Sequence, residues 1–406
     1  MTETLPPLFD PFAPGFTDDP YPQYAVMRAQ APVYEHPFGF WLLTGYEGVS
    51  WLLRAGLSVE DENLATDSLL RQMREATFGD VTPREHAVSM LDRDPPDHTR
   101  LRRLVSKAFT PRAIQALRPR IIELVDEMLG AMAAERRVDL VDALAFPLPF
   151  SVIAEMLGAP PADHDRIRQL TGTVVRSLEP VADPGLAKAI MAADEELRRI
   201  AGEMIAWKRA NPADDLLTAL IHAEDGGDVL DDDELIAQTL LLYIAGHETT
   251  VNLIAGGTLA LLRHPDQLAL LRRDPGLVPN AVEELLRYDS PVQASRRITL
   301  EPVTIDGTTI PAGAFVMASL GSANRDESFW GPDAAALDLR RENARQHVSF
   351  GAGPHHCLGA SLARLEACIA FERLTARFPD LALGGDVVWN GRINLRGPAH
   401  LPVSVG

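Results

Sequence analysis

The sequence is poor in cysteine and in positive charge. Two cysteines among 406 residues are too few for a disulfide framework, which is typical of proteins from a reducing compartment. The 38 Lys and Arg residues are outnumbered by 57 Asp and Glu residues, and the formal net charge of −19 argues against a nucleic-acid partner. The acidic, Pro-rich start MTETLPPLFDPFAPGF lacks the basic and apolar regions of a signal peptide. These absences predict a soluble, cytoplasmic protein that binds no nucleic acid.

A long uncharged run that could cross a membrane is also missing. The longest apolar segment, residues 231–263, starts with DDDE, and its uncharged part before His247 is too short for a membrane span. At 1.5 Å per residue a helix over this segment is roughly 50 Å long, enough to cross a whole domain. The segment therefore predicts a long central helix and no membrane partner.

The stretch LLYIAGHETT, residues 241–250, places polar groups in the middle of this predicted helix. Such groups cost free energy unless they are paired. His247 and Glu248 begin an HExxH signature of zinc hydrolases, but the second histidine of that motif would fall at Val251. A zinc site is thereby excluded, and the polar groups require another function.

Helical periodicity dominates residues 98–290, and strand patterns flank this region on both sides. PVYEHPFGFWLLTG predicts a β-hairpin, and EPVTIDGTTIPAGAFVMASL predicts strands with a tight turn at Asp306-Gly307. A further helix is expected from Leu358 to about Phe378, and VVWNG and LPVSV are short strand candidates. Since no composition shift marks a linker, the chain is expected to form one mainly α domain, residues 1–406, with a small β-rich part.

The stretch FGAGPHHCLG, residues 350–359, has the spacing F-G-x-G-x-H-x-C-x-G and opens a predicted helix. Gly351 permits a positive-φ turn, and Gly359 lets a flat cofactor approach the backbone. Cys357 is placed at a helix N-terminus, which favours a thiolate, and a thiolate is a strong donor to haem iron. A lone cysteine would instead be interpreted as a buried, inert residue. With all of these positions matched, including Phe350, the segment resembles the haem-binding loop of the cytochrome P450 family, the haem-thiolate monooxygenases.

The second cysteine, Cys368, lies eleven residues after Cys357 on the same predicted helix. The two are about 16 Å apart along the helix axis, which excludes a disulfide. We therefore expect Cys368 to pack in the core.

The resemblance implies the cytochrome P450 fold, in which haem b lies between the long central helix and the helix after the cysteine loop. Glu284 and Arg287 in EELLRY match the family's ExxR pair. In the family this pair joins a second arginine before the cysteine loop. The matching residue is Arg341 by its spacing to Phe350, with Arg340 as the alternative. The three residues are expected to have a structural role.

The resemblance also implies a set of cations for the two haem propionates. His98 and Arg102 in DHTRLRR are spaced i,i+4 and lie on one helix face. They match the family's His-x-x-x-Arg, while Arg297 and His355 match its further propionate ligands, and Arg296 is a weaker substitute for Arg297. Charge-assisted hydrogen bonds to carboxylates are strong.

The family's A-G-x-[DE]-T motif, at the oxygen-binding face of haem, matches LLYIAGHETT residue by residue. The resemblance implies that the small residues Ala245 and Gly246 leave room for dioxygen. It also implies that Thr249 hydrogen-bonds the oxygen and that Glu248 relays protons. His247 occupies the variable position and is interpreted as a polar neighbour.

The resemblance therefore identifies a bacterial-type monooxygenase that inserts one atom of O2 into an organic substrate. Electrons are expected from NAD(P)H through a separate ferredoxin or flavodoxin with its reductase, and the enzyme is expected to be a monomer. A basic patch at Arg100, Arg103, Lys107 and Arg112 is a candidate dock for the acidic partner, although an ordinary solvated face would look the same. Two other interpretations are a haem-thiolate sensor, which would not need Glu248 and Thr249, and a peroxide-driven peroxygenase, which typically lacks them.

The substrate is not specified by any motif. Residues 61–90 have mixed character and are expected to form a loop over the pocket. By family position, the residues expected to line the oxygen-binding side are Leu241, Ile244, Ala245, Val292, Ala294, Asn394 and Leu395. This mostly apolar set fits a hydrophobic small molecule such as a terpenoid, steroid, polyketide or fatty acyl compound.

Overall fold

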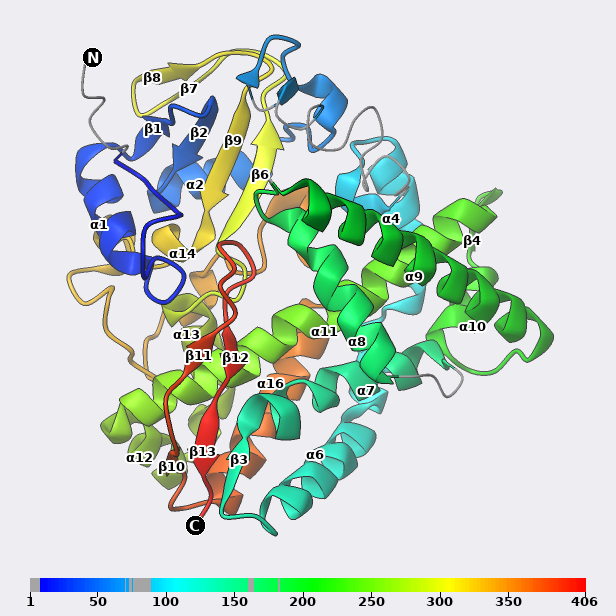
Figure 1. Ribbon diagram of the computed structural model, residues 1–406, viewed down its shortest axis with the longest axis vertical. Coiled ribbons are helices and arrows are strands. Elements are labelled where there is room, and N and C mark those ends of the chain that lie inside the picture. Colours follow the sequence, from blue (N-terminus) through cyan, green and yellow to red (C-terminus); the bar gives the residue numbers. More distant parts are fainter. Residues whose placement is uncertain (1–7, 70, 73–74, 76–88, 160–163, 182) are drawn as a thin grey trace.

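The computed structural model describes residues 8–69, 71–72, 75, 89–159, 164–181 and 183–406. Helices form most of this part, and the long helix α11 (Asp232–Arg263) runs through the middle of the molecule (Figure 1). The other α-helices are α1 (Tyr21–Gln30), α2 (Tyr46–Arg54), α4 (Asp97–Ala108), α5 (Pro111–Ala116), α6 (Arg118–Met132), α7 (Pro147–Leu157), α8 (His164–Val174), α9 (Pro184–Ala210), α10 (Leu216–Ile221), α12 (Pro265–Arg273), α13 (Val278–Tyr288), α14 (Leu320–Ala323), α15 (Glu327–Trp330) and α16 (Ala360–Arg377).

Helix α11 begins and ends where local chemistry dictates. A capping box starts it: the Asp231 carboxylate accepts from the Glu234 N–H at 2.8 Å, and the Glu234 carboxylate accepts from the Asp231 N–H at 3.1 Å. Pro265 follows the last residue, Arg263, and starts α12. Most side chains of α11 are buried against α7, α9 and α16. The predicted central helix is therefore present, one residue shorter at its N-terminus.

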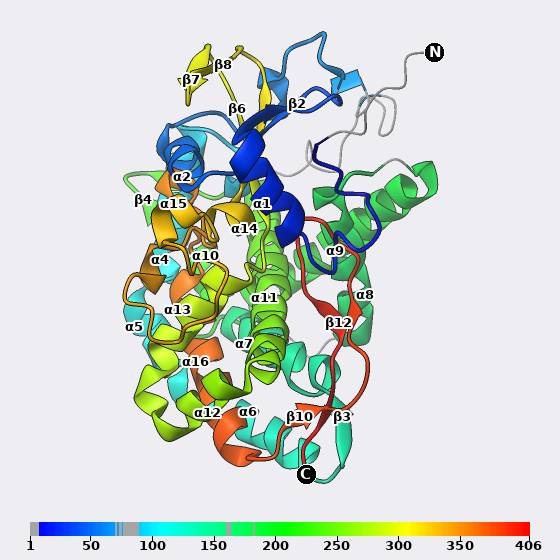
Figure 2. The same cartoon turned by 90° about the vertical axis from the view of Figure 1, so that its left-hand side faces the viewer.

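A four-stranded sheet lies at one end of the molecule, above the helices (Figures 1 and 2). Its strand order is β1-β2-β9-β6, with β2 and β9 parallel and the other pairs antiparallel. The predicted hairpin at residues 32–45 forms β1 and β2, with Val33 opposite Leu43. The strands of this sheet are β1 (Val33–Glu35), β2 (Phe40–Leu43), β6 (Ala294–Ile298) and β9 (Phe315–Ser319).

The smaller β elements are mostly hairpins. Strands β7 and β8 are joined by Asp306 and Gly307, both with positive φ (47° and 78°), as the tight turn predicted at this dipeptide requires. The remaining strands are β3 (Arg137–Asp139), β4 (Glu224–Asp225), β5 (Asp228–Val229), β7 (Val303–Ile305), β8 (Thr308–Ile310), β10 (Ala382–Leu383), β11 (Val388–Trp389), β12 (Pro398–His400) and β13 (Pro402–Ser404).

The mainly α class with a small β-rich part is thus confirmed, and α16 occupies the place of the helix predicted after the cysteine loop. Most of the expected loop at 61–90 lies outside the described residues, which include only its ends and a few positions between them. No helix in the described part of the chain is long and apolar enough to cross a membrane.

Candidate functional site

The cysteine loop is held in an irregular shape directly before α16. The Cys357 N–H donates to the Phe350 carbonyl at 2.9 Å, which closes the loop. Gly351 and Gly353 have φ of 67° and 69°, values that side chains disfavour. A Cβ at Gly353 would also lie 2.5 Å from the Leu53 carbonyl oxygen, so α2 packs directly on the loop. Gly351 and Gly353 are therefore required by the backbone of the loop itself.

Cys357 lies directly before the N-terminus of α16, and the residue as a whole keeps exposed surface although protein atoms surround its sulfur. Loss of hydration among the surrounding protein raises its pKa, while hydrogen bonds from the backbone N–H groups of Gly359 and Ala360 and the charge of Arg102 lower it. The net direction is upward, so the loop alone does not hold a thiolate as firmly as its sequence suggested. A metal cation bound to the sulfur would reverse the balance, since coordination deprotonates a thiol.

The four groups predicted for the propionates come together from three elements: His98 and Arg102 from α4, Arg297 from β6, and His355 from the loop. The rings of His98 and His355 lie 4.2 Å apart, centroid to centroid. None of the four forms an ion pair with a carboxylate within the described ranges. A cluster of cations and imidazoles without an anion is costly to bury and is suited to an anionic ligand.

Arg297 and the two histidines have few polar partners in the described part of the chain. Arg297 is 4% exposed, and among the described residues its guanidinium donates only to the Ser295 hydroxyl and the Arg296 carbonyl. Burial together with the charge of Arg296 lowers its pKa to about 10. Burial and the charges of His98, Arg297 and Arg102 lower the pKa of His355 to about 3. His98 Nε2 is buried and finds no hydrogen-bond partner among the described residues. These groups fit the carboxylates of a haem.

The alternative Arg296 is engaged elsewhere. It pairs with Asp61 and with Asp92, the latter at 3.4 Å. The structure therefore leaves Arg297 rather than Arg296 for an anion at this site.

On α11, Ala245 is exposed although it lies halfway along a mostly buried helix. The Thr249 hydroxyl donates to its carbonyl at 3.1 Å. Gly246 has a packing role that the sequence did not predict. A Cβ there would lie 3.1 Å from Ile153 Cγ1 of α7, so the glycine permits close helix packing.

Glu248 forms an ion pair that the sequence did not predict. Its Oε2 lies 2.9 Å from Nη1 of Arg392, and both side chains are 15% exposed. His247 beside it is fully buried, with Nδ1 2.7 Å from the Tyr243 carbonyl and Nε2 3.4 Å from the Thr171 hydroxyl. It is a satisfied core histidine, in agreement with its interpretation as a polar neighbour.

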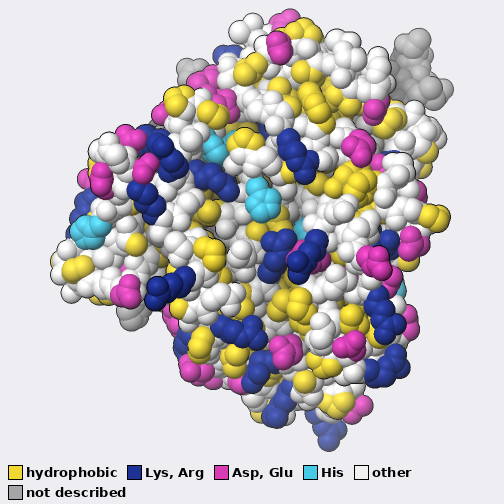
Figure 3. Space-filling view, turned by 180° about the vertical axis from the view of Figure 1, so that it is seen from behind, with side chains coloured by type: hydrophobic (Ala, Val, Ile, Leu, Met, Phe, Trp, Pro, Cys, Tyr) yellow, Lys and Arg dark blue, Asp and Glu magenta, His cyan; other side chains and the backbone are white. Residues whose placement is uncertain are grey.

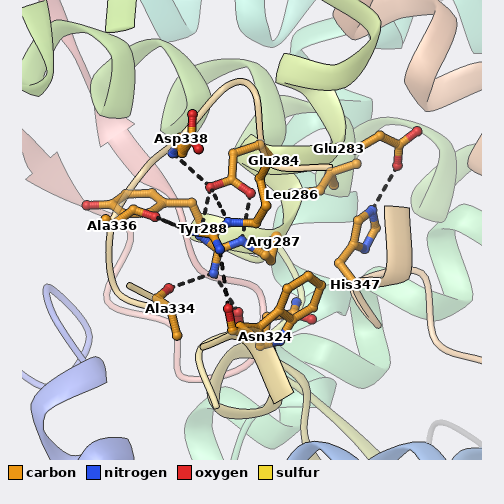
Figure 4. Close-up of polar contacts among 12 residues, drawn as sticks. Glu283, Glu284, Leu286, Arg287, Tyr288, Asn324, Ala334, Ala336, Asp338 and His347 are labelled. Carbon is orange, nitrogen blue, oxygen red and sulfur yellow. Dashed lines mark hydrogen bonds and ion pairs between the residues drawn. The ribbon is translucent and has the colours of Figure 1, made fainter. Parts of the chain in front are cut away.

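Glu284, Arg287 and Arg341 form a buried cluster, and Figure 4 shows the side chains of Glu284 and Arg287 pointing toward each other. The Glu284 carboxylate accepts two hydrogen bonds of 2.7 Å from Arg287 and one of 3.3 Å from Arg341 Nε. Arg287 also donates to the carbonyls of Asn324, Ala334 and Ala336, which tie the irregular segment to α13. Arg341, and not the exposed Arg340, is therefore the second arginine.

The residues expected to line a substrate pocket are brought together in part. Val292 and Leu395 form a β-bridge, and the Asn394 side chain accepts from the Ala294 N–H at 3.0 Å. Leu241 and Ile244 are half-buried on α11 and pack against two neighbouring apolar clusters.

The basic patch on α4 is largely neutralised, which differs from the expectation of an open dock. Arg103 and Lys107 pair with Asp225 at 3.1 and 2.7 Å, and Arg100 pairs with Glu234. Arg112 is exposed and has no ion pair within the described ranges. When the molecule is seen from behind, Lys and Arg side chains at the left-hand edge lie beside Asp and Glu side chains (Figure 3). The patch is neutralised because the β4–β5 hairpin, which carries Asp225, packs onto α4 in the tertiary structure.

Comparison with known proteins decides the family. The family model named Cytochrome P450 matches residues 276–382, a range that includes the Glu284 cluster and the cysteine loop. Cytochrome P450 107B1 of Saccharopolyspora erythraea is 44% identical over 404 residues, 97% of each chain. The chain belongs to the cytochrome P450 family. A vitamin D(3) 25-hydroxylase of Pseudonocardia autotrophica is 42% identical over 417 aligned positions, 100% of this chain and 98% of that protein.

Solved structures agree. The P450 PksS of the Bacillus subtilis bacillaene polyketide synthase superposes with a TM-score of 0.87 at 36% identity, covering 98% of this chain and all of that one. The recognition of a bacterial-type P450 from the cysteine loop is confirmed. This P450 is accordingly a haem-thiolate monooxygenase.

Proposed function

We propose that Cys357 ligates the haem iron and that His98, Arg102, Arg297 and His355 hold the propionates. The observation that carries this proposal is a group of cations and imidazoles, with His98 and Arg297 buried and Arg102 and His355 half-buried, that has no carboxylate ion-pair partner in the described part of the chain. Bound haem would supply an iron centre that activates dioxygen.

The cysteine loop positions this ligand. The Phe350 carbonyl holds the Cys357 N–H, and Gly359 presents its own N–H to the sulfur. A side chain at Gly359 would add a carbon 3.9 Å from Cys357 Sγ. The Glu284–Arg287–Arg341 cluster has a structural role, since it fixes the segment that precedes the loop.

On α11, the neighbouring residues Glu248 and Thr249 deliver protons. The Thr249 hydroxyl donates to the carbonyl of Ala245, an exposed residue, and Glu248 next to it is a carboxylate that can exchange protons with water. Gly246 supports this arrangement by letting α11 pack closely on α7.

The substrate is a hydrophobic small molecule that contacts Leu241, Ile244, Ala245, Val292, Ala294, Asn394 and Leu395. A relative named for hydroxylating vitamin D(3) and one named with a polyketide synthase support a steroid-like or polyketide substrate over smaller compounds. O2 supplies the inserted oxygen atom, and NAD(P)H supplies electrons through a separate ferredoxin or flavodoxin and its reductase. We further propose that residues 1–406 form one domain that acts as a cytoplasmic monomer.

The test combines a spin-state screen with reconstituted turnover. Steroids, polyketides, terpenoids and fatty acids are titrated into the purified holoenzyme, and hits are incubated with NADPH, a surrogate ferredoxin and its reductase. We expect a low- to high-spin shift followed by a product 16 mass units heavier. Turnover with hydrogen peroxide but none with the reduced ferredoxin would instead support a peroxygenase.

A further inference from the structure

The C-terminal loop at residues 390–396 contacts the proposed substrate pocket. The Asn394 side chain accepts from the Ala294 N–H, and its backbone carbonyl accepts from the Gln293 N–H at 2.8 Å. Leu395 forms a bridge with Val292. One side of the loop is therefore part of the pocket wall.

The same loop reaches Glu248 through Arg392. Arg392 donates from Nη1 to the Glu248 carboxylate at 2.9 Å and from Nη2 to the Gly172 carbonyl of α8 at 3.4 Å. Both members of the pair are mostly withdrawn from solvent, which strengthens their attraction relative to a surface pair. The guanidinium thus fixes the carboxylate in relation to two helices.

Glu179 anchors the loop between these contacts. Its carboxylate accepts hydrogen bonds from three successive backbone N–H groups: Ile393 at 2.8 Å, Asn394 at 3.1 Å and Leu395 at 3.2 Å. Converging N–H groups of this kind form an anion site, and hydrogen bonds to a charged acceptor are strong. The anchor lies immediately next to Arg392 in the sequence.

We propose that Arg392 is a positioning residue for Glu248 and that Glu179 makes this loop a rigid connector between the pocket wall and the proton-delivering acid. The proposal rests on the proposed function of Glu248. A compound that displaces Asn394 or Leu395 displaces Arg392 as well, so proton delivery depends on what occupies the pocket.

Hydrogen–deuterium exchange of the holoenzyme tests the anchor without any turnover. Glu179→Gln should accelerate exchange of the backbone amides of residues 393–395 by roughly tenfold or more, because these hydrogen bonds lose a charged acceptor. Glu195→Gln is the matched control, since Glu195 is exposed on α9 and distant in sequence from the loop. Unchanged exchange at residues 393–395 in Glu179→Gln would overturn the anchor.

A double-mutant cycle tests the positioning role. NADPH oxidation is measured in H2O and D2O, with a surrogate ferredoxin and its reductase and no organic substrate, for Arg392→Gln, Glu248→Gln and the double variant. We expect each single variant to slow oxidation by roughly tenfold and to raise the solvent isotope effect. The double variant should be no slower than Glu248→Gln, because Arg392 acts through Glu248. Arg392→Lys, which keeps the charge, should recover part of the rate.

The controls show whether the further proposal fails or the proposed proton relay fails. Arg176→Gln, at an exposed arginine near Glu179, should behave as wild type, and an intact reduced-carbonyl Soret band shows that each variant is folded around haem. If the two rate losses multiply in the double variant, Arg392 does not act through Glu248 and the further proposal is wrong. If Glu248→Gln itself has no effect, the proposed proton relay is wrong instead.

Discussion

The Thr249 hydroxyl donates a hydrogen bond to the Ala245 carbonyl, at a distance of 3.1 Å, in the middle of the helix that crosses the molecule. A hydroxyl bonded back to the preceding turn weakens the regular helical pattern and leaves its own oxygen available as an acceptor. Ala245 is exposed in the middle of the helix, so a ligand can reach α11 at this turn.

Thr249→Ala should uncouple the enzyme while leaving haem and substrate binding intact. The change removes a hydroxyl and little volume, so electrons still arrive but protons are misdirected. We expect product per NAD(P)H to fall by roughly tenfold and hydrogen peroxide to rise. NAD(P)H, product and peroxide are measured together.

Thr250→Ala is its matched control, because Thr250 is a buried neighbour on the same helix. Thr250→Ala should form as much product per NAD(P)H as wild type does. A fully coupled Thr249→Ala would show that this threonine serves packing alone.

Cys357→His should abolish the strongly red-shifted Soret band of the reduced carbonyl complex, because the thiolate donor is lost. Cys368→Ser should keep the band. Cys368 is half-buried beside an apolar cluster, and burial raises the pKa of its thiol to about 11, so it remains a neutral thiol. If Cys357→His kept the band and Cys368→Ser lost it, the iron ligand would be Cys368.

Arg341→Ala should destabilise the protein by about 3 to 5 kcal/mol, since it removes one partner of a buried ion-pair cluster and leaves Glu284 with less compensation. Arg340→Ala, at the exposed neighbouring position, should change stability by less than about 0.5 kcal/mol. Urea unfolding of the two holoenzymes provides the comparison. Equal losses would mean that the spacing to Phe350 selected the wrong arginine.

Acid stability should depend on Glu283. Burial raises the pKa of this carboxyl, but hydrogen bonds from His347 at 3.0 Å (Figure 4) and from Arg364 at 2.8 Å outweigh it and lower the pKa to about 2. In the unfolded chain the Glu283 carboxyl titrates near pH 4.3, so between about pH 2 and pH 4.3 the folded state binds fewer protons than the unfolded state. This contribution, on the order of 3 kcal/mol, is complete above about pH 4.3 and is lost as the pH falls toward 2.

Glu283→Gln should therefore be less stable than wild type at pH 7, and its stability should fall less steeply below pH 4.3. Urea midpoints between pH 7 and 3 measure both effects. Glu342→Gln, at an exposed position, should follow the wild-type curve. Parallel curves of stability against pH for wild type and Glu283→Gln would contradict the lowered pKa of Glu283.

The sequence by itself determined the features that are local along the chain. The central helix, the turn at Asp306-Gly307 and the cysteine loop could be predicted because cap residues, helical periodicity and positive-φ glycines act within a few residues of one another. The loop's fixed spacing was sufficient to identify the family.

Tertiary structure alone decided which distant groups meet. Arg392 reaches Glu248 across 144 residues of sequence, and Glu179 binds N–H groups more than 200 residues away. Asp225 neutralises the basic patch only because its hairpin folds onto α4, and Ile153 of α7 explains Gly246. These contacts depend on how whole helices pack, and an ion pair between remote residues leaves no periodicity or spacing in the sequence from which it could be predicted.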